Sequence, residues 1–144
     1  MAITTNAIAS SFKKELLEGK HDFTASTGSA FKLAMYNSNA VLGKSTTSYT
    51  TGSEVTSPAG YTAGGKALVN TGTSVASSVA ITSFSNLSFT NVTLTARGSL
   101  IYNTSNSNTG VCVLDFGSDK TATAGTFTIQ FPAYTTSAAI LRIS

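Results

Sequence analysis

The chain has 144 residues, six acidic and nine basic side chains, one histidine and a net charge of +3, and this length fits one domain with a buried core. Charged residues make up only 10% of the chain, against about 25% in an ordinary globular protein. A nucleic-acid-binding face needs clustered positive charge, and the scattered basic residues of this chain do not predict one.

One amphipathic helix is predicted near the N-terminus, over residues 6–18. Ile8, Phe12 and Leu16 are four residues apart and form one apolar stripe. Gly19 is placed to end the helix in the left-handed conformation. We expect this helical arm to cover the edge of a sheet or to lie on a neighbouring subunit, which makes the three stripe residues candidate subunit contacts.

A long excursion follows the first predicted strand, over residues 37–66. It is rich in Ser, Thr, Asn and Gly, and Tyr49, Val55 and Tyr61 are isolated anchors in it. An excursion of this length is either a functional arm or a set of short irregular strands of the same sandwich. On the first alternative, Tyr49 and Tyr61 are further candidate subunit contacts.

Alternating residues predict strands in the rest of the chain. In 92–102, apolar residues and one glycine alternate with mostly polar residues, which buries one face of a strand. The phase of this alternation changes near Thr90–Asn91, which indicates a bulge or a turn. A further turn is expected at Gly117–Ser118–Asp119, and Pro132 indicates a strand end or a sheet edge. Strands are predicted over 30–36, 66–70, 75–81, 84–89, 92–102, 111–116, 126–131 and 139–143.

These elements predict a mainly β fold in a single domain over residues 1–144. Many strands with turns between them are typical of an antiparallel β-sandwich, jelly-roll or Ig-like, here with one short N-terminal helix. The chain opens without a signal-peptide pattern and has no apolar run of membrane-spanning length. We therefore expect a protein made in a reducing cytoplasm.

The sequence predicts no catalytic, cofactor-binding or metal-binding residues. Residues 60–67 fit the phosphate-binding pattern G-x-x-x-x-G-K, but Ala67 stands where a Ser or Thr would hold magnesium, so a glycine-rich turn is expected. His21 has no second His or Cys for zinc and is expected to interact with the helix C-terminus. Cys112 is the only cysteine and lies in an apolar run, which predicts a buried, unreactive thiol.

Several stretches of the chain carry a resemblance that spans nearly its whole length. They are Met1–Ile8, Ser11–Gly19, Phe31–Tyr36, Gly60–Gly65, Ala96–Gly98, Leu100–Asn103, Val113–Lys120 and Gly125–Pro132. In this order they resemble a family of small virion structural proteins of tailed bacteriophages, notably those of marine bacteria. The resemblance implies a non-enzymatic structural protein of the virion, made in the host bacterial cytoplasm.

The leading hypothesis is a capsid decoration or cement protein that stabilises the major capsid lattice by protein–protein contacts. Its 21 Ser and 24 Thr give a hydroxyl-rich surface that costs little to desolvate in an assembly. The expected partners are the major capsid protein or other virion proteins and copies of the chain itself in a homo-oligomer, with no nucleic-acid contact required and no membrane. One alternative is a neck or tail component of the virion. Another is a carbohydrate-binding or adhesin-like module, which the Thr-rich surface and five tyrosines favour, and a small hydrolase is opposed by the lack of a catalytic set.

Overall fold

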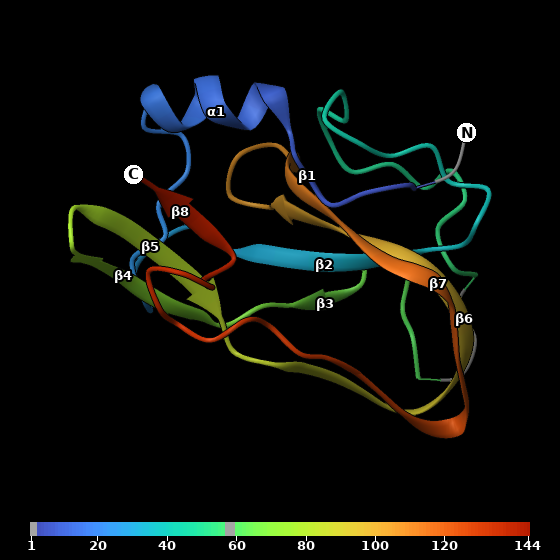
Figure 1. The fold of residues 1–144 in the computed structure, drawn as a ribbon. Coiled ribbons are helices and arrows are strands. Elements are labelled where there is room, and N and C mark those ends of the chain that lie inside the picture. The colour runs from blue at the N-terminus through green and yellow to red at the C-terminus, as the bar shows by residue number, and fades with distance from the viewer. Residues whose placement is uncertain (1–2, 57–59) are drawn as a thin grey trace.

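A computed structural model describes residues 3–56 and 60–144 of the chain (Figure 1). Strands make up 47% of the chain and helix 6%, in two antiparallel sheets with one short helix, so the predicted mainly β sandwich is confirmed. The elements in chain order are β1 (Ala7–Ile8), α1 (Ser10–Leu17), β2 (Phe31–Tyr36), β3 (Lys66–Ala67), β4 (Asn70–Ala76), β5 (Val79–Phe84), β6 (Leu87–Asn103), β7 (Thr109–Ile129) and β8 (Leu141–Ile143).

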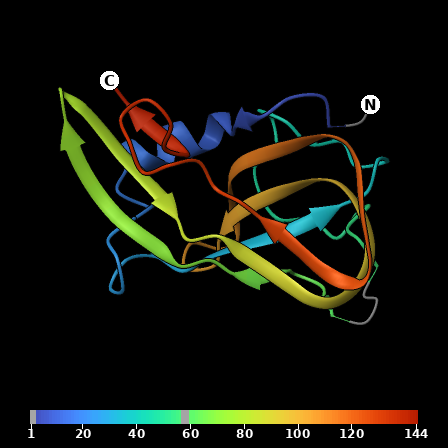
Figure 2. The same ribbon diagram turned by 60° about the horizontal axis from the view of Figure 1, so that its bottom comes forward.

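The two sheets differ in size and shape. The larger has the strand order β1-β7-β6-β2-β3 and the smaller the order β4-β5-β8. The strands β6 and β7 have 17 and 21 residues and pair as one bent hairpin, on the right in Figure 1. The hairpin of β4 and β5 projects from the opposite side of the molecule, beside β8 (Figures 1 and 2). Arg142 is the only charged residue in the strands of the smaller sheet.

The strand β2 is buried on both faces and divides the core in two. One face, which carries Phe31 and Leu33, packs in the main core between the sheets. The other face carries Tyr36 and packs against Ala40 and Leu42 of the excursion. Alternating burial is lost in this strand because the excursion covers the face that would otherwise meet water.

The excursion contains no strand before β3 within its described residues, and residues 57–59 lie outside them. Two isolated bridges hold it to the larger sheet, Tyr36 to Glu54 and Ser48 to Thr109. Of the two alternatives for this segment, the structure therefore shows an irregular covering loop and not a series of short strands.

The N-terminal helix is shorter than predicted. It begins at Ser10, because Ala7 and Ile8 instead pair with Val113 and Cys112 at the edge of β7. Strand pairing satisfies the backbone groups that a first helical turn would leave unpaired. The predicted end is confirmed, since Gly19 has a φ of 71°.

Several predicted strand boundaries are wrong. The strand expected over 75–81 is interrupted by Ser77 and Ser78, whose φ angles of 50° and 64° form the turn between β4 and β5. The strand expected over 84–89 is likewise divided, between the end of β5 and the start of β6. Serine is an uncommon residue at positive φ, so nothing in its identity indicated the break at 77–78.

The bent hairpin explains two further outcomes. The phase change near Thr90–Asn91 is a register shift between Phe89 and Val92, as predicted, with Asn91 at a φ of 51°. The turn expected at Gly117–Ser118–Asp119 is instead a wide bulge inside β7, where residues 116–119 stand opposite Arg97 alone. Extra residues in one strand increase its bend without ending the pairing, so β7 runs on to Ile129, and Pro132 follows its end.

Candidate functional site

His21 is buried behind α1 and holds a structural position. Its Nε2 lies 2.7 Å from Oε2 of Glu15, and its Nδ1 lies 2.9 Å from Nδ2 of Asn103. Because Oδ1 of Asn103 accepts the Ser105 N–H at 2.9 Å, the amide nitrogen faces His21, whose Nδ1 accepts and whose Nε2 donates to Glu15. The sequence predicted an interaction with the helix C-terminus, and this is wrong: the partners of His21 are the side chains of Glu15 and Asn103. Together they fasten the segment after α1 to the end of β6.

The glycine-rich stretch is a turn, as predicted, and it packs against β2. Gly60, Gly64 and Gly65 have φ angles of 88°, 93° and 80°, a region that favours glycine. A Cβ added to Gly65 would lie 1.8 Å from the carbonyl oxygen of Leu33. The stretch leads into β3 and not into the helix whose amides hold phosphate in a nucleotide-binding loop.

Cys112 is a buried thiol, as predicted. Its side chain is buried in β7, and burial raises the pKa of the thiol to about 12. Because the thiolate is the reactive form, Cys112 is a poor nucleophile at neutral pH. The described residues also contain no group of three or more His, Cys, Asp or Glu side chains that could hold a metal ion.

Glu54 lies buried under the excursion at the centre of a tyrosine cluster. Its carboxylate accepts hydrogen bonds from the hydroxyls of Tyr49 and Tyr61, at 2.5 and 2.7 Å, and from the N–H of Gly64 at 2.7 Å. Tyr102 stacks on Tyr49 with ring centroids 4.7 Å apart and donates to the Gly64 carbonyl at 2.6 Å. Tyr61 is buried and Tyr49 half-buried, so both side chains serve chiefly to hold the excursion to the sheet.

An apolar groove of about 780 Å³, which we call the α1 groove, lies between α1 and the smaller sheet. Ile8, Phe12 and Leu16, the three residues of the predicted stripe, all line it, and Leu141 and Ile143 of β8 line the other wall. Only Phe12 is fully buried within α1. Phe12 is buried in the main core and Leu16 packs partly against it, while Ile8 leaves apolar surface open in the groove.

Exposed apolar side chains gather around the α1 groove. Leu17 is 91% exposed, Ile143 58% and Ile8 38%, and all three line it. Val75 is 71% exposed and lies in the same cross-strand row as Ile143, with Ala80 between them. Directly opposite residues in an antiparallel sheet project from the same face, so Val75 extends the apolar wall.

The chemistry of the α1 groove suits a protein partner. Among the described residues that line it, the charged ones are Lys13, Asp22 and Arg142. A groove with so few charges can bury apolar side chains of a partner at a small desolvation cost, and contiguous exposed apolar surface marks an interaction site.

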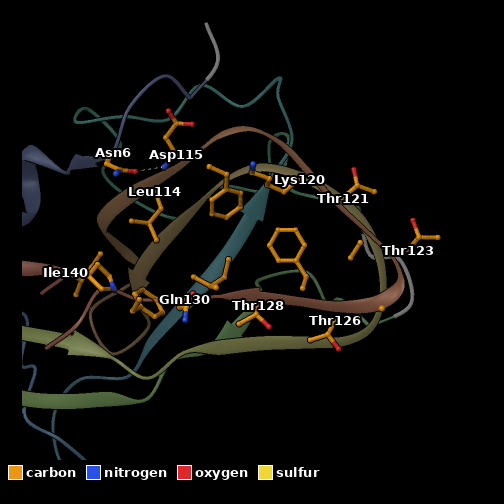
Figure 3. Close-up of a pocket in the computed structure, with 17 residues that line it drawn as sticks. Asn6, Leu114, Asp115, Lys120, Thr121, Thr123, Thr126, Thr128, Gln130 and Ile140 are labelled. Carbon is orange, nitrogen blue, oxygen red and sulfur yellow. Dashed lines mark hydrogen bonds between the residues drawn. The ribbon is translucent and has the colours of Figure 1, made fainter. Parts of the chain in front are cut away.

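A second hollow, of about 750 Å³, opens on the inner face of the bent strand β7 (Figure 3). Leu114 and Ile140 lie at one end of it and Thr123 at the other. The rings of Phe116 and Phe127 line it, with centroids 5.9 Å apart. Of these two rings, Phe116 is half-buried and Phe127 is buried, so Phe116 is the aromatic side chain that a sugar ring could reach.

Comparisons with protein-family models, with curated proteins and with solved structures found no match to this chain. In the part of the chain that the structure describes, no helix is both long and apolar enough to cross a membrane.

Sequence reasoning found one wall of the α1 groove and missed the other. The spacing of Ile8, Phe12 and Leu16 marks the first wall. Leu17 lies next to the stripe but does not share its four-residue spacing. Ile143 and Val75 belong to strands that are far apart in sequence, so no local spacing connects them. A signal for the second wall was present in the alternation of Leu141 and Ile143 around Arg142, but that pattern alone does not say which element the apolar face meets.

Proposed function

We propose that this chain is a structural protein of tailed bacteriophage particles that binds the capsid shell as a decoration, or cement, protein. The observation that carries the proposal is the α1 groove, where Leu17, Ile143 and Ile8 leave apolar surface open. The resemblance to small virion proteins supports the same function.

The mechanism is the addition of buried area across the shell, without a chemical step. Each Å² of apolar surface buried against the major capsid protein contributes about 25 cal/mol. Leu17 is the most exposed large apolar side chain of the described residues, so it has the most to gain from such a contact. Copies repeated over a lattice also make individually weak contacts strong in sum. No contact with the packaged DNA is needed.

A cryo-EM map of purified particles tests the location of the protein. We expect density for this β-sandwich on the outside of the capsid, with α1 and the α1 groove facing the major capsid protein. Density for the chain only in the neck or tail would replace the cement function by the alternative of a neck or tail component. Absence of the chain from purified particles would overturn a virion function altogether.

Binding to undecorated shells tests the surface. Leu17→Asp places a charge in the α1 groove and should weaken binding at least tenfold, because the carboxylate must be desolvated. Val41→Asp is the matched control, since Val41 is 69% exposed and lies in the excursion. Equal binding of both variants would show that the α1 groove is not the contact surface.

The hollow on β7 favours a second candidate function, binding of a carbohydrate. Phe116 is half-buried and provides aromatic surface in the hollow, with the buried Phe127 ring behind it. If this function holds, Phe116→Ala abolishes retention on glycan columns while Leu17→Asp leaves it unchanged. A protein that binds no glycan in such a screen is not an adhesin module of this kind.

A further inference from the structure

We propose that the outer edge of β4 pairs antiparallel with the same strand of a second copy of this chain, joining two three-stranded sheets into one six-stranded sheet. This inference goes beyond the proposed function. It concerns the purified protein alone and holds wherever the protein resides.

The strand β4 is an edge strand along its whole length and carries no charge. It has seven residues and pairs with β5 only. The other three edge strands, β1, β3 and β8, have two, two and three residues. Short edge strands offer few groups to another chain, and a long one offers a template for pairing. The outer side of β7 beyond Val113 is also unpaired, but it carries Asp115, Asp119, Lys120 and the bulge at 116–119, and charges and bulges protect an edge. The uncharged β4 is therefore the more favourable edge for a partner strand.

The turn at Ser77–Ser78 determines which backbone groups of β4 are free. Both turn residues have positive φ, the type I′ geometry of a two-residue hairpin loop. Ala76 and Val79, which flank such a loop, form a hydrogen-bonded pair, and hydrogen-bonded and open pairs then alternate along the ladder. Thr73 and Val75 therefore direct their N–H and C=O groups away from β5, and no backbone hydrogen bond joins either residue to another described segment.

The outer edge of β4 lacks the features that prevent an exposed strand from pairing with another chain. Natural proteins protect such edges with Lys, Pro or inward-pointing charges. No charged residue and no proline occurs between Ala67 and Ala96. Four consecutive residues, Thr73 to Ala76, are exposed, and Val75 is 71% exposed. The bulge at Gly72 disturbs only the inner end of the strand. An unprotected edge with exposed valine indicates a surface that is covered in the working protein.

The absence of charge favours a second copy as the occupant. A twofold antiparallel pairing places the same short strand on both sides of the interface, so any charge on it would lie close to a like charge of the second copy. The strand β4 has none. A pairing centred on Ser74 places Thr73 opposite Val75 of the second copy and Val75 opposite Thr73 of the second copy. This register uses every outward N–H and C=O of the two residues, and cross-strand pairs of β-branched side chains are favourable.

This register also joins two α1 grooves. Val75, Ala80 and Ile143 form one row on the sheet face that lines the α1 groove. In the six-stranded sheet this row continues into Thr73 of the second copy, so the apolar walls of the two copies meet on one face. The dimer would then present a doubled apolar surface to any further partner.

Disulfide trapping tests the register. In the proposed pairing, Ser74 faces its own copy as a non-hydrogen-bonded pair, with Cα atoms about 4.5 Å apart, a distance that a disulfide spans. Ser74→Cys should form a covalent dimer under mild oxidation, while native Cys112 stays buried and unreactive. Ser118→Cys, an exposed serine in β7, is the control and should stay monomeric on denaturing gels. If Ser74→Cys and Ser118→Cys cross-link equally, or if neither forms a covalent dimer, the pairing centred on Ser74 is wrong.

Sedimentation over a concentration series tests the interface without a disulfide. The native chain should dimerise, and Val75→Lys should raise the dissociation constant at least tenfold by placing an ammonium at the edge. Val69→Lys is the matched control, because Val69 is 63% exposed and lies outside β4, and it should dimerise like the native chain. A native chain that stays monomeric at about 100 μM, or a Val75→Lys variant that dimerises as well as the native chain, would sink the proposal. Neither result bears on whether the protein is found on capsids.

Discussion

At the scale of single residues, Gly65 is the position at which a small change should cost most. A methyl group there would meet the Leu33 carbonyl, and the backbone is in the left-handed region. We expect Gly65→Ala to lower the free energy of unfolding by at least about 3 kcal/mol. Gly43→Ala is the control, since an added Cβ at Gly43 meets nothing within 4 Å. Similar urea midpoints for the two variants would contradict the packed turn.

The tyrosine cluster predicts loss of stability at alkaline pH. Burial, helped by the nearby Glu54 carboxylate, raises the pKa of Tyr36, Tyr49 and Tyr61. The folded protein therefore keeps protons that the unfolded chain releases near pH 10. This contribution is fully present below about pH 10 and falls as pH rises further, by about 1.4 kcal/mol per pH unit for each group.

Urea unfolding between pH 8 and 12 measures this dependence. The native chain should lose stability steeply above about pH 10, and Tyr61→Phe should show a shallower slope because one titrating group is gone. Lysine deprotonation contributes equally to both proteins, so the comparison isolates the tyrosine. Identical slopes would mean that Tyr61 titrates normally in the folded state.

At the scale of elements, the β4–β5 hairpin carries avoidable strain. Ser77 and Ser78 both adopt positive φ, which costs a residue with a Cβ about 1 kcal/mol. Asn-Gly is the preferred pair for this turn, so the double variant Ser77→Asn, Ser78→Gly should stabilise the protein by about 1 kcal/mol. Thr128→Gly, in the paired part of β7 opposite Ser88, should have the opposite sign, because glycine weakens a strand. A lower melting temperature for the hairpin variant would argue against the type I′ turn.

The N-terminal segment is part of the core and not a detachable arm. Ile3, Ala9 and Phe12 are buried, at 0%, 0% and 3% exposure. Deleting residues 1–18 should therefore abolish cooperative unfolding, because the loss of these side chains exceeds about 5 kcal/mol, the lower end of the stability of a typical domain. Leu17→Ala, at a side chain that is 91% exposed, should leave the unfolding transition almost unchanged. A truncated chain that unfolds cooperatively would show that the segment is dispensable.

At the scale of the whole molecule, this low-charge sandwich leaves the apolar α1 groove and the edge of β4 open. Both surfaces are suited to repeated contacts in an assembly. We expect particles decorated with the native chain to release DNA at a higher temperature than undecorated particles, because each bound copy stabilises the assembled state. Particles mixed with Leu17→Asp should behave like undecorated ones, and particles mixed with Val41→Asp like native ones. DNA-dye fluorescence during heating measures this, and equal release temperatures with and without the native chain would contradict a cement function.

The sequence alone determined the class of this fold. Alternation along 92–102 and 126–131 predicts strands wherever one face is buried, and a single His and a single Cys argue against a catalytic or metal site. These conclusions depend on local pattern and composition, which need no knowledge of long-range pairing. The same local signal located Ile8, Phe12 and Leu16, one wall of the α1 groove.

Only the tertiary structure decided which faces stay open. Val75, Ile143 and Leu17 are far apart in the chain, and the pairing of β4, β5 and β8 beside α1 brings their surfaces together. The tertiary structure also decided the burial of Tyr61. The sequence makes Tyr61 a candidate subunit contact, but in the fold its side chain is buried and its hydroxyl donates to Glu54. An apolar side chain looks alike in sequence whether it is buried or exposed, because its burial depends on which distant element packs against it.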